Sequence, residues 1–230
     1  MYQWTADRIE WYDRAVRFTG FSDKVAEFLS PHIPPDESVC DLGCGTGHLA
    51  MALARRGYRV KAADRNPLVL DFLRRESERR GLNVGIVDAD WHTLKAPPAE
   101  NITMVFAGRL DTELPLYLEL CGKRLLLVVK NSPQSHVKND GETSPSYVSK
   151  AHLLQALETM NLHYQVEDHR VEFGQPLRSL EEAEAYIASF NDRGFRPAEI
   201  TDRLIQFDDS EFPLYLPNEK RVALFVIDKQ

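Results

Sequence analysis

Cysteine is scarce in this chain: Cys40, Cys44 and Cys121 are the only three among 230 residues. An odd number of cysteines, two of them in or beside one glycine-rich turn, argues against a disulfide framework. Cys40 and Cys44 have the spacing of half a zinc site, but no second Cys/His pair with matching spacing lies nearby in the sequence, so we expect no metal. This cysteine usage favours a reducing compartment, and we expect a cytoplasmic protein.

The chain also lacks long apolar segments and an excess of positive charge. No apolar run approaches the ~20 residues that a membrane-spanning helix needs, and residues 1–7 do not resemble a signal peptide. We therefore expect no membrane partner. Lys and Arg number 28 against 35 Asp and Glu, which gives a net charge of −7. A nucleic-acid binder normally needs a cationic field, so we expect no nucleic-acid partner.

The sequence does contain a regular alternation of strand and helix patterns. The expected strands are residues 38–42, 58–63, 83–87, 102–106, 125–129, 163–173 and 222–227. The expected helices are residues 8–29 (as one or two helices), 47–56, 67–80, 114–121, 148–160 and 179–191. Such alternation predicts an α/β fold with a mainly parallel sheet, helices on both faces and right-handed crossovers.

A glycine-rich turn follows the first expected strand, with the sequence Asp41-Leu-Gly43-Cys44-Gly45-Thr-Gly47. Glycine permits backbone conformations with positive φ and allows a ligand to approach the main chain closely. The helix behind the turn presents free N–H groups and the positive end of its dipole. The turn is therefore a candidate binding site for a ligand that carries a carboxylate or a phosphate.

The spacing of the glycines separates two classes of ligand. The dinucleotide fingerprint G-x-G-x-x-G/A, counted from Gly43, requires its third glycine where His48 stands. Counting from Gly45 reaches Ala50, but the turn then begins two residues late. Asp41, before the first glycine, suits an ammonium group and repels a pyrophosphate. An NAD-dependent oxidoreductase is therefore the less favoured of two enzyme classes.

Residues 39–47, Val-Cys-Asp-Leu-Gly-Cys-Gly-Thr-Gly, closely resemble the first motif of class I S-adenosylmethionine (SAM)-dependent methyltransferases, and the chain is similar to their small-molecule types 11 and 25. The resemblance implies a Rossmann-like fold with a seven-stranded, mostly parallel sheet and SAM as the cofactor. In that family the acidic residue and the glycines hold the methionine end of SAM. This implies cofactor contacts from Asp41, Gly43, Cys44, Gly45 and Gly47.

Later segments resemble the second and third motifs of the family. Asp64, followed by Arg65, ends the second expected strand, where the family's acidic residue accepts hydrogen bonds from the ribose hydroxyls. Asp88 and Ala89 follow the third strand, and the resemblance implies contacts to the adenine amino group and ring. Asp90 beside them is expected to be a helix cap or a surface acid.

The end of the fourth expected strand is a weaker match. Ala107 and Gly108 are expected to lie beside SAM through their backbone, although Thr103 or Met104 stands where many relatives carry an acid. Two neighbouring side chains have open assignments. Trp91 either flanks the adenine or packs in the core. His48 either donates to the SAM carboxylate or serves only packing.

The resemblance also implies a division of the chain. Residues 1–35 are expected to form a helical cap over the cofactor and acceptor pocket, although the aromatic residues there would equally suit a helix packed on the sheet edge. Residues 36–230 are expected to form the SAM-binding domain, with a polar loop at 131–147 and a helical insertion at 174–200. The segment 213–217 is either a second pocket wall or a rigid connector.

The expected function is transfer of a methyl group from SAM to a small-molecule acceptor by in-line displacement, in a monomer or homodimer. The catalytic residue is unknown. His136 and Tyr147 in or beside the polar loop are candidates for acid/base roles, and Asp111 and Glu113 after the fourth strand are others, unless they merely serve solvation and the start of a helix. A non-catalytic SAM-binding module stays open as an alternative.

Overall fold

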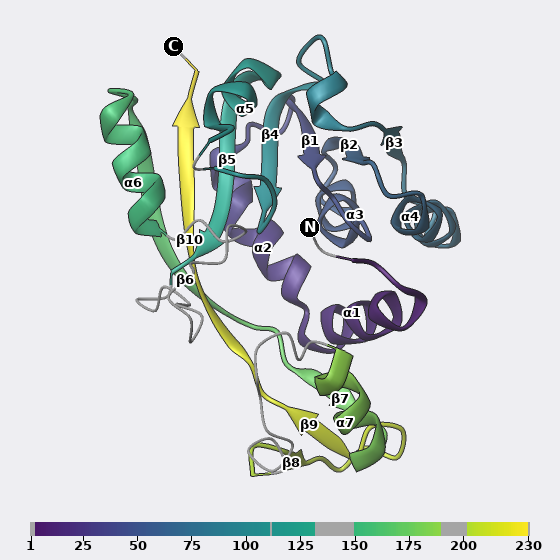
Figure 1. The fold of residues 1–230 in the computed structure, drawn as a ribbon. Helices are drawn as coiled ribbons and strands as arrows, with labels where there is room; N and C mark the ends of the chain where they lie inside the picture. The colour runs from purple at the N-terminus through teal and green to yellow at the C-terminus, as the bar shows by residue number, and fades with distance from the viewer. Residues whose placement is uncertain (1–2, 111, 132–149, 190–201, 230) are drawn as a thin grey trace.

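The computed structural model describes residues 3–110, 112–131, 150–189 and 202–229. These residues form a seven-stranded sheet with the strand order β3-β2-β1-β4-β5-β10-β6 and a separate three-stranded sheet with the order β7-β9-β8 (Figure 1). Within this part of the chain, no helix is both long and apolar enough to cross a membrane.

Seven strands make up the large sheet: β1 (Ser38–Leu42), β2 (Arg59–Asp64), β3 (Val84–Asp88), β4 (Ala99–Val105), β5 (Cys121–Lys130), β6 (Tyr164–Glu172) and β10 (Glu219–Asp228). Strands β1 to β5 run parallel to one another, whereas β10 runs antiparallel to its two neighbours, β5 and β6. The predicted Rossmann-like fold with a mostly parallel seven-stranded sheet is therefore confirmed.

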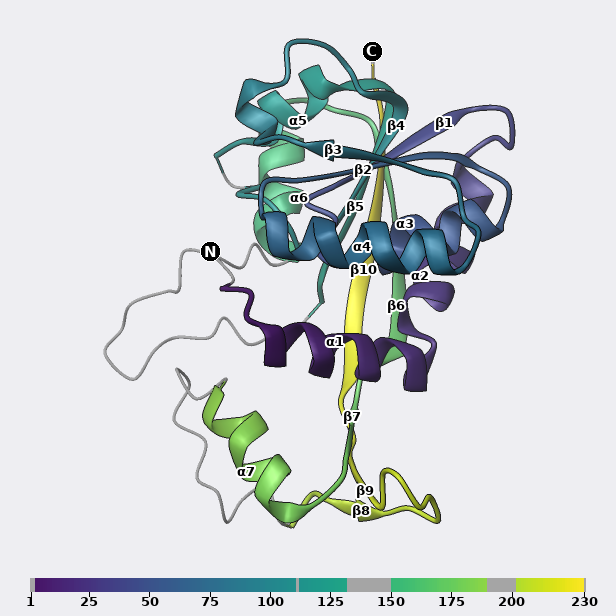
Figure 2. The same ribbon diagram turned by 90° about the vertical axis from the view of Figure 1, so that its right-hand side faces the viewer.

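Helices cover both faces of this sheet (Figure 2). They are α2 (Phe21–Leu29), α3 (His48–Arg55) and α4 (Pro67–Arg79) on one face, and α5 (Leu114–Leu120) and α6 (Lys150–Thr159) on the other. Helices α1 (Ala6–Thr19) and α7 (Leu180–Ser189) lie outside these layers, and η1 (Ser30–His32) and η2 (Trp91–Thr93) are short 3₁₀ helices. Alternate residues of each strand face opposite sides. Val39 of β1 packs with α2, α3 and Leu73 of α4, whereas Cys40 packs with α5 and α6.

Local chemistry accounts for most element ends. The Asn66 side chain accepts from the Leu68 N–H and caps α4, and Pro67 occupies the first turn, where a missing N–H costs nothing. Ser179 caps α7 as predicted, because its hydroxyl accepts from the Glu182 N–H. The predicted end of the fourth strand at residue 106 was wrong: β4 stops at Val105, since Phe106 has a φ of +53° and leaves the extended conformation.

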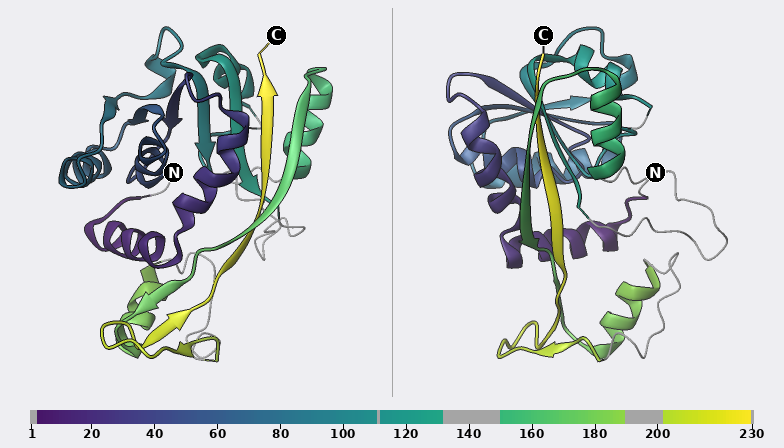
Figure 3. Two further views of the ribbon diagram at one scale, coloured as in Figure 1. Left: turned by 180° about the vertical axis from the view of Figure 1, so that it is seen from behind. Right: turned by 90° about the vertical axis from the view of Figure 1, so that its left-hand side faces the viewer.

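The helical insertion predicted at 174–200 contains helix α7 in its described part, but it also contains a short strand, β7 (Gln175–Leu177). Two more strands follow beyond it, β8 (Ile205–Gln206) and β9 (Leu214–Leu216). Together they form a small lobe that continues from the ends of β6 and β10 (Figure 3). Strands of two or three residues are too short for an alternating pattern, so the sequence showed no periodicity there. The segment 213–217 is thus mainly a strand; residues 190–200 lie outside the described part.

Helix α1 lies between the large sheet and this small lobe (Figure 3). The guanidinium of Arg14, in a side chain only 7% exposed, pairs with Glu10 on its own helix and with Glu182 of α7, at 2.7 Å to the latter. It also lies 4.9 Å from the centre of the Phe212 ring. A buried cation held from several sides in this way ties α1 to the lobe, because removing any one partner leaves a buried charge poorly compensated.

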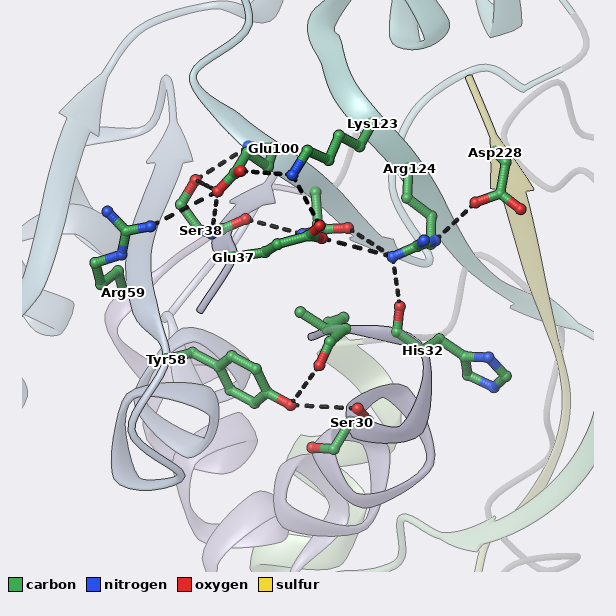
Figure 4. A network of polar contacts seen from close by, with 12 residues as sticks. Ser30, His32, Glu37, Ser38, Tyr58, Arg59, Glu100, Lys123, Arg124 and Asp228 are labelled. Carbon is green, nitrogen blue, oxygen red and sulfur yellow. Dashed lines mark hydrogen bonds and ion pairs between the residues drawn. The ribbon is translucent and has the colours of Figure 1, made fainter. Parts of the chain in front are cut away.

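A charged network closes the amino ends of the parallel strands (Figure 4). Glu37, which is 9% exposed, accepts hydrogen bonds from Asn101 and Lys123, each at 2.9 Å. Arg124 donates to Asp228 and to the His32 carbonyl, both at 2.8 Å. Arg124 and Asp228 also line a hollow of about 500 Å³ beside η1. Each carboxylate of this network pairs with a cation, which indicates that the network stabilises the fold.

Glu37→Ala should lower the free energy of unfolding by about 1–3 kcal/mol, because the Asn101 amide and the Lys123 ammonium lose a charged acceptor in a largely buried place. Urea unfolding measures this loss. Asp36→Ala is the control: it removes an equal charge from the neighbouring residue, which is exposed, so it should cost less. An equal or larger cost for the control would contradict the assignment.

The same residue predicts a pH dependence. Hydrogen bonds from Asn101 and Lys123 hold the pKa of Glu37 below its ordinary value of 4.5. Its contribution to stability is therefore complete above pH 4.5 and is lost as the pH falls through the lowered folded-state pKa. The difference in stability between the wild type and Glu37→Ala should shrink in acid, and a difference that grew below pH 4 would refute this role.

Candidate functional site

The predicted site residues lie at the carboxyl ends of four strands that are adjacent in the sheet. The order β3-β2-β1-β4 places the segments after Asp88, Asp64, Leu42 and Val105 side by side at one edge. In open α/β sheets ligands bind beyond this edge, where the strand order reverses. The reversal occurs here between β1 and β4, directly above the glycine-rich turn.

All three glycines of the turn require the left-handed region of backbone space. Gly43, Gly45 and Gly47 have φ values of +74°, +52° and +72°. The N–H groups of Gly43 and Cys44 both donate to the Ala63 carbonyl on β2, at 2.8 and 3.1 Å. The turn is therefore wound tightly against the neighbouring strand, in a shape that residues with side chains rarely adopt.

Each glycine of the turn also meets a side chain where its own Cβ would stand. A Cβ on Gly43 would lie 3.0 Å from Ala107 and 3.2 Å from the Trp91 ring, and one on Gly45 would lie 3.0 Å from the Trp4 ring. Trp4 belongs to the segment before α1, so the N-terminal segment reaches the turn. The bare backbone thus lies within an aromatic enclosure contributed by distant parts of the chain.

The carboxylate of Asp64 holds the turn from the tip of β2. It accepts from the Gly45 N–H and from the Asn66 N–H, both at 2.9 Å, and no ion pair involves it among the described residues. The Asp64 carbonyl accepts from the Ala89 N–H at 3.2 Å. An adenine bond to the Ala89 N–H, implied by the resemblance, would therefore compete with a bond inside the protein.

Asp41 lies beneath the turn and is only 3% exposed. Its carboxylate accepts from the Thr103 hydroxyl at 3.4 Å and from the backbone N–H of Ala50 in the first turn of α3. Burial raises the pKa of Asp41 to about 7, and repulsion from Asp64 adds to the effect, although these two hydrogen bonds oppose it. The structure thus places Asp41 inside the protein rather than on the open face of the turn.

The histidine in the third-glycine position of the dinucleotide pattern is buried and fully bonded. His48 is 5% exposed; its Nδ1 lies 2.8 Å from the Thr46 hydroxyl and its Nε2 lies 2.8 Å from the Asp13 carboxylate of α1. The imidazole therefore fastens α1 to the start of α3. A bond from His48 to a SAM carboxylate would require one of these contacts to break.

A second charged chain crosses the tips of β3 and β4. Asp90 caps η2, as predicted, by accepting from the His92 N–H at 3.0 Å, and its other oxygen pairs with Arg65. The His92 ring lies between Asp90 and Glu113, which are 2.6 and 3.1 Å away. Hydrogen bonds that the His92 ring makes to the carboxylates of Asp90 and Glu113 raise the pKa of His92. This bridge was not predicted, because His92 and Glu113 are 21 residues apart in the sequence.

The residues after β4 pack tightly rather than opening a cavity. Gly108 has a φ of +80°, and a Cβ there would lie 2.6 Å from the Tyr117 hydroxyl. That hydroxyl donates to Glu113 and accepts from the Arg109 N–H at 3.0 Å. Of the two residues Ala107 and Gly108, Ala107 faces Gly43 and therefore lies beside the turn.

Several other predicted residues have simple outcomes. Asp88 is exposed at the tip of β3, and Cys44 is partly buried, with its thiol donating to the Gly45 carbonyl at 3.5 Å. Trp91 packs in the core formed with α5 and its ring also covers Gly43, so the packing assignment is confirmed and the contact with adenine stays a prediction. The candidates Asp111, His136 and Tyr147 lie outside the described residues. No group of three or more His, Cys, Asp or Glu side chains in the described part is placed to hold a metal ion.

Part of the chain is similar to a known family. Residues 39–117, about a third of the sequence, match the family model described as a methyltransferase domain. The match spans the glycine turn, Asp64, Asp88 and the bridge between His92 and Glu113.

Individual relatives cover only part of the sequence. The cypemycin N-terminal methyltransferase of a Streptomyces species is 38% identical over 87 residues, which are 37% of this chain and 35% of that protein. The demethylmenaquinone methyltransferase of Thermus thermophilus is 39% identical over 75 residues, 31% of this chain and 34% of that protein. The chain thus matches about a third of the length of these curated relatives.

Solved structures extend the likeness to the whole fold. The magnesium protoporphyrin IX methyltransferase of Synechocystis, determined with bound S-adenosylhomocysteine, superposes with a TM-score of 0.58 at 13% identity, over 99% of this chain and 89% of that one. At this identity the likeness concerns the fold alone. It agrees with the strand order described above.

Gly47→Ala should destabilise the protein more than Gly81→Ala. Both glycines have left-handed backbones, with φ of +72° and +62°, so both variants carry a similar strain of about 1–2 kcal/mol. A Cβ at Gly47 would lie 2.4 Å from Leu73, whereas one at Gly81 meets nothing within 4 Å. Overpacking should add about 1–3 kcal/mol to the loss at Gly47, measured by urea unfolding. Equal losses would show that Leu73 moves aside freely.

Proposed function

We propose that this protein transfers a methyl group from SAM to a small-molecule acceptor. The proposal rests on the charge at the glycine turn. Asp64 bonds to the turn and Asp41 lies buried beneath it, and neither has an ion pair with any cation among the described residues. Two unpaired carboxylates next to a glycine backbone favour a ligand whose end is cationic, as the methionine end of SAM is.

The residues present fit this cofactor by two further tests. Gly43 and Gly45 have no room for a side chain, so their backbone forms a cradle that only glycine allows. The indole N–H of Trp91, beside Gly43, is buried and has no hydrogen-bond partner among the described residues. A buried donor without an acceptor is costly, and a ligand with acceptor atoms at this edge would relieve that cost.

The same features argue against a dinucleotide. A pyrophosphate at the turn would lie near two carboxylates and would be repelled. The dinucleotide fingerprint needs its third glycine where His48 stands. The buried imidazole of His48 is bonded to Thr46 and Asp13 at the start of α3. We therefore place an NAD-dependent oxidoreductase last, after the other alternative, a non-catalytic SAM-binding module.

When bound, SAM supplies a methyl group already activated on a sulfonium. The protein's residues then have three tasks. The glycine turn and Asp64 bind and orient, because a methyl acceptor must meet the donor in line. Trp4 and Trp91 exclude water from the turn. Asp88, exposed at the next strand tip, is available for the nucleoside.

We also propose the class of acceptor and the cellular compartment. A small molecule is favoured because the net charge of −7 offers little attraction to a phosphate backbone. Three cysteines without a disulfide among the described residues suit a reducing cytoplasm. Of possible assemblies we favour a monomer or a homodimer.

Thermal unfolding with SAM, S-adenosylhomocysteine and NAD separates the candidate functions. We expect SAM and its product to stabilise the protein by about 2.7 kcal/mol at a hundredfold excess over Kd, and NAD to have no effect. Transfer of labelled methyl from SAM to any member of a broad small-molecule panel would then exclude a module that only binds. Stabilisation by NAD alone, or methylation confined to tRNA or DNA, would overturn the proposal.

Asp64→Ala should weaken SAM binding roughly tenfold or more, because a charge-assisted hydrogen bond contributes about 1.5–3 kcal/mol. Calorimetric titration measures the change. Asp71→Ala on the exposed side of α4 removes an equal charge whose side chain is 62% exposed, and it should bind SAM normally. Unchanged affinity for Asp64→Ala would show that the contact at the tip of β2 is misassigned.

A further inference from the structure

We propose that Asp41 carries a proton in the cofactor-free protein and releases it when a cationic ligand occupies the glycine turn, so that cofactor binding and Asp41 ionisation are linked. The inference rests on the proposed function, since SAM is the cation invoked. It assigns to Asp41 a positioning role that acts through charge, from beneath the turn.

The first support is the way Asp41 is enclosed. The residue is 3% exposed, and β1 places its side chain on the face that α3 covers. Its hydrogen-bond partners are neutral: the Thr103 hydroxyl at 3.4 Å, a long bond, and the Ala50 N–H. Moving an ionised carboxylate from water into such a place is expensive unless a cation accompanies it, and the group otherwise takes up a proton.

The second support is the absence of that cation among the residues the structure describes. The titratable groups around Asp41 are Asp64 from β2, Cys44 in the turn and Cys40 on its own strand. Asp64 repels a second negative charge, and burial raises the pKa of both thiols, to about 12 for Cys40, so neither compensates Asp41. His48 begins α3, but its Nε2 pairs with Asp13.

A ligand cation at the turn reverses this balance. Burial raises the pKa of Asp41 to about 7 in the free protein. An opposite charge within a few ångströms lowers a carboxyl pKa by 1–3 units, so the proton leaves to solvent as the ligand binds. Binding of SAM then depends on pH. Below the pKa that Asp41 has in the free protein, the dissociation constant for SAM should increase by up to roughly tenfold for each unit by which the pH falls.

Calorimetric titration of the whole protein with SAM at pH 6.5, in two buffers of different ionisation enthalpy, counts the protons released. The ammonium of SAM is almost fully protonated at this pH, so the ligand contributes little. From a pKa of about 7 we expect the wild type to release about 0.7 proton per SAM bound. Asp41→Asn, which mimics the neutral acid in size and shape, should bind SAM more weakly and release none.

His48→Gln is the matched control, because it replaces another buried polar side chain next to the turn and leaves Asp41 in place. It should still release the proton. Normal SAM binding by the wild type without proton release would overturn the linkage and leave the proposed function standing, and so would release that persists in Asp41→Asn or disappears in His48→Gln. Failure of the wild type to bind SAM at all would overturn both.

Discussion

The organisation of this protein depends on two carboxylates held at the tips of adjacent parallel strands, neither of which pairs with a cation among the described residues. Asp41 lies under the glycine turn and Asp64 bonds to it. The opposite end of the sheet provides the contrast, since Glu37 there pairs with Lys123 and lies near Arg124. The ion pairs of Glu37 stabilise the fold. Two neighbouring carboxylates without a cation lower stability, and binding of a cationic ligand restores it.

The turn that carries this charge is shaped by contacts from much of the chain. Its glycines are wound against β2, and side chains from the N-terminal segment, η2 and α4 take the space that a Cβ would need. Helix α1 is fastened on one side to α3 through Asp13 and His48, and on the other to the small lobe through Arg14 and Glu182. Helix α1 therefore connects the small lobe to the helix that follows the glycine turn.

The sequence predicted what local chemistry determines. Asp64 and the glycines were found because strand ends, left-handed turns and helix starts leave short-range patterns. The bridge from His92 to Glu113 and the bond from Asp13 to His48 were not, because each joins residues that are 21 or 35 positions apart. The burial of Asp41 also escaped prediction: the residue type fits a ligand contact, but its orientation follows from which sheet face α3 covers. The strands of the small lobe were too short to leave a pattern.

We propose that the glycine turn holds the amino-acid end of SAM, whose ammonium group S-adenosylhomocysteine also carries. A crystal structure with S-adenosylhomocysteine tests this placement most directly. The account predicts the amino-acid portion against the backbone of residues 43–47 and the nucleoside extending past Asp64 toward Asp88. A nucleoside bound elsewhere, with the turn empty or taken by a phosphate group, would contradict it.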